Sequence, residues 1–113
     1  MLKTTVLPKV TVSSDEVTRQ RTEITLMSYD KNVHQIKIPT DLTEGEINRV
    51  LVIFTFPFDE SVIQLNGAWV DGHIQFTLPN ELRGYRGNVY IEIDIDLTDD
   101  RQLTFARYHL QSV

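Results

Sequence analysis

Acidic side chains gather near the end of the sequence, in the stretch GNVYIEIDIDLTDD. One glutamate and four aspartates lie within nine residues, from Glu92 to Asp100. Closely spaced carboxylates can bind calcium, or can serve as the general acid and base of a hydrolase. Whether they do so here depends on the element that carries them.

The carboxylates alternate with aliphatic residues, and this alternation is typical of a β-strand. Glu92, Asp94 and Asp96 share one phase and would face solvent. Neighbours on one face of a strand are roughly 6.6–6.8 Å apart, too far for three short carboxylates to share a calcium ion. We interpret the acidic row as a solvated face; contact with a partner or ion, and catalysis, are the alternatives. The opposite phase predicts five core residues: Val89, Ile91, Ile93, Ile95 and Leu97.

The sequence gives no support for a calcium loop, a histidine metal site or a serine nucleophile. A calcium loop that began at Asp94 would place Asp99 where glycine is required and Phe105 where the bidentate glutamate belongs. His34, His73 and His109 fall in separate predicted strands, and no serine lies in a Gly-x-Ser-x-Gly elbow. We therefore expect no catalytic residue, no metal site and no cofactor, and hence no enzyme.

The elements that carry these residues are mostly short strands. Asp71-Gly72 separates two strand-like runs and predicts a hairpin, and residues 98–100 predict another. The run of residues 5–12 contains Pro8, which places that strand at an edge. Residues 40–48 predict a loop with one helical turn, for which Asp41 is a candidate cap. About eight strands result, so we predict an all-β fold, a single antiparallel β-sandwich of immunoglobulin-like or jelly-roll topology.

Composition narrows the function classes. The chain has 113 residues and no cysteine, which predicts one domain over residues 1–113 without disulfides. The net charge is −5 and no basic stripe is present, so we expect no nucleic-acid partner. No apolar run approaches the ~20 residues that span a bilayer, so we expect no membrane partner.

Four residues are the candidate protein interface. Leu51 and Ile53 occupy the phase of an apolar strand that is normally polar, so either a loop of this chain or a neighbouring subunit should cover them. Tyr85 and Arg86 lie at a predicted turn and are of residue types common at interfaces. Trp69 is expected to pack at the core or its shoulder. A β-bulge near Phe105 would reconcile the two phases of the last strand.

The second half resembles a known family. Gly72 precedes the strand IQFTLP, Gly87 precedes the alternating strand NVYIEIDIDL, and Thr104-Phe105 leads into ARYHL. In this order the motifs are similar to those of the N-terminal domain of phage baseplate upper proteins, from tailed phages of Gram-positive bacteria. The resemblance covers residues 22–113. It departs at PFDESVIQLNGAWV, where the family more often has a short turn of the PDG type.

The resemblance implies an immunoglobulin-like sandwich at the N-terminal part of a longer protein. Such a domain would dock on the tail-tip hub and help carry the receptor-binding apparatus of the virion. Its partners would be other tail and baseplate proteins, it would be oligomeric in the virion, and it would assemble in the host cytoplasm. The alternatives are a carbohydrate-binding module, for which Trp69 and Tyr90 are the starting residues, and a small hydrolase or metal enzyme.

Overall fold

The computed structural model describes residues 2–7, 9–10, 21–26, 33–57, 60–82 and 87–112. Within these residues the chain forms nine strands and two short 3-10 turns. The elements are β1 (Leu2–Val6), β2 (Arg21–Leu26), β3 (Val33–Pro39), η1 (Glu44–Glu46), β4 (Ile47–Phe56), β5 (Ser61–Asn66), β6 (Ala68–Val70), β7 (His73–Thr77), η2 (Asn80–Leu82), β8 (Gly87–Leu97) and β9 (Gln102–Ser112).

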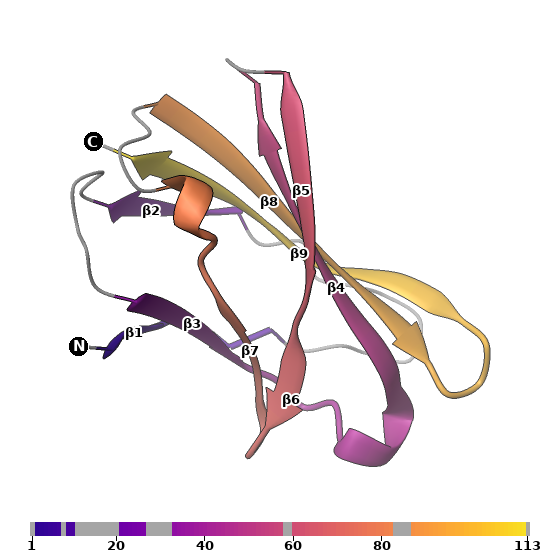
Figure 1. Ribbon diagram of the computed structural model, residues 1–113. Helices are drawn as coiled ribbons and strands as arrows, with labels where there is room; N and C mark the ends of the chain where they lie inside the picture. The colour runs from indigo at the N-terminus through magenta and orange to yellow at the C-terminus, as the bar shows by residue number, and fades with distance from the viewer. Residues whose placement is uncertain are drawn as a thin grey trace.

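The strands form two sheets that pack face to face (Figure 1). One sheet has the order β1-β3-β7-β6, and the other has the order β2-β9-β8-β4-β5. This confirms the predicted all-β sandwich. Most strand pairs are antiparallel, and two edge strands depart from this, because β1 pairs with β3 and β2 pairs with β9 in parallel. Strand β1 lies at an edge as expected, although it begins before the predicted run, and Pro8 itself lies outside the described residues.

The core lies between the sheets and is filled by the inward phases of their strands. Phe54 of β4 contacts Phe76 of β7 edge to face, with ring centroids 5.9 Å apart, and so joins the two layers. All five aliphatic residues predicted from β8 are buried. The largest fully buried side chains are Phe54, Phe105, Ile36, Ile38, Ile74, Ile91, Ile93, Ile95 and Leu110.

The hairpin of β8 and β9 contains the predicted bulge. The register passes from Ile93 opposite Ala106 to Asp94 opposite Thr104, so Phe105 is the extra residue. Phe105 and Ala106 are consecutive and yet both fully buried, which regular alternation would not allow. At the tip, Asp100 has φ 67° and its N–H donates to the Leu97 carbonyl over 3.2 Å, which confirms the second hairpin.

The strand-like run before Asp71-Gly72, residues 62–70, is divided between the two sheets. Strand β5 belongs to the five-stranded sheet and β6 to the four-stranded sheet, with Gly67 between them. A Cβ atom at Gly67 would lie 2.8 Å from Cγ1 of Val50 and 3.2 Å from the carbonyl oxygen of Gln75. The backbone passes so close to both layers that only glycine fits without rearrangement.

One predicted turn is confirmed by the structure, and the predicted cap of another is wrong. Asp71 and Gly72 have φ of 50° and 80°, which confirms the two-residue hairpin between β6 and β7. The 3-10 turn η1 confirms the single helical turn, but Asp41 is not its cap. Thr43 is the N-cap residue, and its N–H donates to Glu46 Oε1 over 3.0 Å.

Candidate interaction surface

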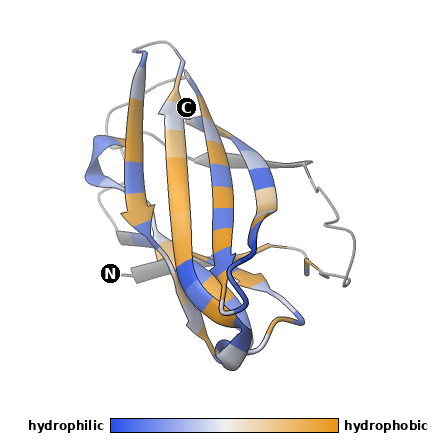
Figure 2. Ribbon diagram, turned by 90° about the vertical axis from the view of Figure 1, so that its right-hand side faces the viewer, coloured by the Kyte–Doolittle hydropathy of each residue, from blue (hydrophilic) through white to orange (hydrophobic). Residues whose placement is uncertain are grey.

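Leu51 and Ile53 lie on the outer face of the five-stranded sheet, the face turned away from the core. They alternate along β4 with the buried Val50, Val52 and Phe54, and both are half-buried. In Figure 2 this face is turned to the viewer, and β4 is the almost continuously orange strand at its centre. The predicted doubly apolar strand is therefore present in the fold.

The strand register extends this apolar surface toward β5. Ile53 lies between Gln64 of β5 and Glu92 of β8, and one row further Thr55 lies between Val62 and Tyr90. Val62 is 57% exposed and Tyr90 is 50% exposed. We call Leu51, Ile53, Val62 and Tyr90 the outer strip.

What covers the outer strip stays a prediction. Among the described elements, β4 is contacted chiefly by its sheet neighbours β5 and β8, and also by β6. Leu51 and Ile53 are half-buried, and strands β5 and β8 flank them in the sheet. Tyr85 and Arg86 lie outside the described residues.

Tyr90 is not isolated on this face. Its ring stacks on His109 of β9, with centroids 5.2 Å apart and planes inclined by 25°. His109 Nε2 in turn lies 2.9 Å from Asn88 Oδ1, which fixes the imidazole. An exposed, pre-oriented aromatic pair loses little side-chain entropy on binding a partner. Sequence reasoning missed this pair as an interface, although Tyr90 stands in the polar phase of β8, where an aromatic residue is unusual.

Trp69 does not share a surface with Tyr90. Trp69 lies in β6 of the other sheet and packs half-buried against the core. Its Nε1 donates a hydrogen bond to the Leu42 carbonyl over 2.9 Å. The two aromatics considered for a sugar platform therefore do not form one shelf, and Trp69 has the predicted shoulder position.

The acidic row of β8 lies on the outer face, as predicted. Glu92 accepts a hydrogen bond from Arg107 Nε over 2.8 Å in an exposed ion pair. Asp94 is more confined: Oδ1 is buried and has no hydrogen-bond partner. Burial raises the pKa of the Asp94 carboxyl above its ordinary 3.8, and the nearby charge of Glu92 raises it further.

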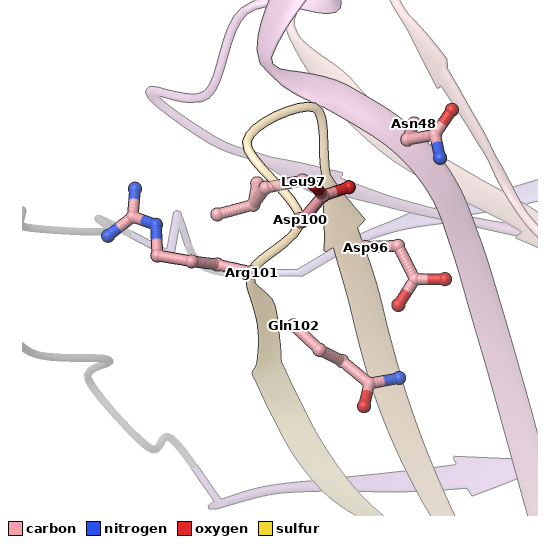
Figure 3. A pocket seen from close by; sticks show the side chains of 6 residues that line it. All are labelled: Asn48, Asp96, Leu97, Asp100, Arg101 and Gln102. Carbon is pink, nitrogen blue, oxygen red and sulfur yellow. The ribbon is translucent and has the colours of Figure 1, made fainter.

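Asp96 contributes to a polar hollow at the end of the β8–β9 hairpin (Figure 3). The hollow has a volume of about 320 Å³, and in the figure the side chains of Asp96 and Gln102 lie beside each other within it. Arg101 points away and pairs with Asp99, with Nε 2.7 Å from Oδ2. The lining residues are Asn48, Asp96, Leu97, Asp100, Arg101 and Gln102.

Nothing in the described part of the chain groups three His, Asp or Glu side chains as metal ligands. His34 Nε2 lies 2.6 Å from Thr5 Oγ1 of the neighbouring strand β1, and His73 Nδ1 lies 2.9 Å from the Asp71 carbonyl oxygen, whereas His109 lies on the outer face of the five-stranded sheet. The three imidazoles are thus held by separate local contacts. Among the same residues, no helix has the length and apolar character to cross a membrane.

Comparisons with known proteins bear on the fold. No protein-family model and no curated protein matches the sequence. Among solved structures, the N-terminal domain of phage TP901-1 ORF48 is similar, with a TM-score of 0.61 and 13% sequence identity. The match covers 99% of this chain and 98% of that chain. The two chains share a fold. The resemblance predicted from the sequence is confirmed at that level.

Proposed function

We propose that this chain is a structural domain of a phage tail baseplate that works by protein–protein contact and catalyses no reaction. It would dock on the tail-tip hub and help carry the receptor-binding apparatus. As the N-terminal part of a longer protein, it would function in the virion tail after assembly in the host cytoplasm. The observation that carries this proposal is the shared fold with a phage ORF48 domain over nearly the whole of both chains.

Two further observations support it. The sequence motifs at Gly72, Gly87 and Thr104 resemble those of the N-terminal domain of phage baseplate upper proteins, independently of the fold. The fold also offers a surface suited to contact: the outer strip, beside the stacked pair of Tyr90 and His109. Apolar area and a fixed aromatic are the usual centre of an interface.

The outer strip is small for a permanent interface, and repeated geometry would compensate. When several linked copies dock on one symmetric hub, the second and later contacts become intramolecular, and avidity can exceed single-site affinity by roughly 10²–10⁴. A modest contact from each domain is then sufficient. This reasoning favours a rigid adaptor over a domain that must bind tightly alone.

The test is co-expression with the tail-tip hub protein encoded by the same genome, followed by affinity purification and light scattering. We expect a stable complex with the unaltered chain. Changing both Leu51→Lys and Ile53→Lys should weaken it by roughly tenfold or more, because two buried interface groups would carry charge.

The matched control is Thr77→Lys, an exposed position on the outer face of the other sheet. It adds one lysine charge, against two in the double variant, and should leave the complex intact. Circular dichroism confirms that each variant keeps its strands. If the hub protein does not bind, the docking proposal is wrong; if the double variant binds as tightly as the control, the outer strip is not the docking surface.

A further inference from the structure

The sandwich has four edge strands, and they differ in how well they are protected against pairing with another strand. Edge strands expose unpaired backbone groups, and natural proteins guard them with charges, proline or short length. Strand β1 carries Lys3, strand β2 carries Arg21 and Glu23, and strand β6 has only three residues. Strand β5 has six residues and carries no charge.

The unguarded run is longer than β5 itself. Residues 61–70 contain no charged residue and no proline, in a chain whose net charge is −5. Among the described strands, β5 pairs only with β4 and stands at the end of its sheet, at the left edge in Figure 2. Such an edge is a template for one more strand.

The hydrogen-bonding direction of β5 follows from its pairing with β4. The Gly67 N–H donates to the Val50 carbonyl over 3.0 Å, so in this ladder the odd-numbered residues of β5 bond to β4. Because N–H and C=O groups alternate sides along a strand, the even-numbered residues face the open edge. These are Val62, Gln64 and Asn66.

We propose that β5 pairs antiparallel with β5 of a second copy of this chain, around a two-fold axis through Gln64. Opposite residues in antiparallel strands must point to the same face, which restricts the axis to a residue of the strand. Centring on Gln64 places Val62 opposite Asn66 of the second copy. All three outward-bonding residues then pair, which gives about six backbone hydrogen bonds. Centring on Ile63 would leave Asn66 outside the pairing.

The side chains of β5 suit a second copy. Ile63 and Leu65 face inward and are half-buried at the open end of the core. In this register Ile63 lies opposite Leu65 of the second copy, in a non-hydrogen-bonded pair where side chains approach most closely. Each copy would cover the aliphatic residues that the other leaves open.

Among the sheet edges, electrostatics favours β5 for pairing with a second copy. Two identical chains of net charge −5 repel each other, and a two-fold axis sets each side chain near the axis against its own kind. Strand β5 carries no charged residue that would face its own copy across the axis, whereas β1 and β2 do carry charged residues. The pairing would also join the outer strips of both copies into one surface. It does not depend on the proposed docking role, which would stand if the chain were monomeric.

Sedimentation velocity over a wide concentration range tests the pairing. We expect a reversible dimer of twice the 13.1 kDa chain mass. Gln64→Lys and Gln64→Glu should each weaken it by roughly five- to tenfold, because like charges then face each other across the axis. Neither change should unfold the domain, because the backbone of Gln64 does not bond to β4.

Mixing the two variants gives the decisive result. Lys and Glu become opposite partners in a mixed dimer, which should recover the affinity of the unaltered chain. Gln111→Lys is the control, an exposed glutamine on β9 of the same face, and it should leave the dimer unchanged. Amide hydrogen exchange should also slow at Val62, Gln64 and Asn66 as concentration rises.

A monomer at all concentrations would overturn the pairing. So would a dimer that both Gln64 variants leave intact, or one whose mixed variants show no recovery. If a variant does not fold, the exchange measurement on the unaltered chain still decides: no protection of the three even-numbered amides in the dimer places the contact elsewhere. A monomer that gains this protection only with another tail protein would assign β5 to a different partner.

Discussion

Strands β8 and β5 belong to the same sheet and yet differ in how their sequences specify them. In β8, aliphatic and acidic residues alternate along the strand, and the buried and solvated phases are separated by charge. In β5 and its continuation β6, no residue is charged, and the chain leaves one sheet for the other at Gly67.

The difference lies in what a shift of one residue would cost. A one-residue slip of β8 would bury carboxylates, which is expensive, so its register is strongly specified. In the uncharged run from Ser61 to Val70, the same slip would bury no charged group. This run contributes β5 to one sheet and β6 to the other, and β5 ends its sheet as an edge strand. Close packing at Gly67, rather than charge, fixes its position.

The largest expected effect contrasts the centre of the sheet with its edge. Ile93→Ala should lower the free energy of unfolding by about 2–5 kcal/mol, because Ile93 is fully buried between β4 and β9. Ile63→Ala should cost roughly 1–2 kcal/mol, since the edge side chain is half-buried. Urea unfolding at low protein concentration measures both. Equal costs would mean that β5 is as well packed as β8.

A smaller effect tests the sheet crossing. Gly67→Ala should destabilise the fold by about 1–3 kcal/mol, because its Cβ would clash with Val50 and the Gln75 carbonyl. Gly45→Ala is the matched control: nothing lies within 4 Å of its added methyl, and a change within about 0.5 kcal/mol is expected. Thermal unfolding compares them. Indistinguishable midpoints would contradict the close approach at Gly67.

The smallest effect concerns Asp94 in the acidic phase of β8. Its folded-state pKa is raised, so the native state binds the proton more tightly and its contribution to stability is lost as pH rises from 3.8 through the raised value. Asp94→Asn should therefore raise the thermal midpoint slightly at pH 7. The gain should vanish below pH 3.8, where Asp94 is protonated in both states. A destabilised variant at pH 7 would show that the carboxylate is satisfied.

Local patterns predicted much of the fold. The phase of β8, the turn at Asp71-Gly72 and the bulge at Phe105 each follow from residues adjacent in sequence. The parallel pairing of β2 with β9 does not, because it depends on where distant segments meet. The crossing at Gly67 was also missed, because an isolated glycine within an alternating run indicates a bulge as readily as a change of sheet.

The outer strip was predictable only where it depended on the alternation of residues along a single strand. The pattern of β4 placed Leu51 and Ile53 on the outer face. Neither Val62 nor His109 could be added, because their proximity to that strip and to Tyr90 comes from the register between strands. The interface role of Tyr85 and Arg86 stays a prediction.

The last described strand takes an interior position in the larger sheet. Strand β9 lies between β2 and β8, so the sheet lacks an interior strand until residues 102–112 are in place. In a nascent chain on the ribosome, β2 therefore lacks its sheet neighbour until these residues emerge, and the sandwich closes only after that point. Truncation before residue 102 would remove an interior strand, so such products should be substrates for chaperones and proteases.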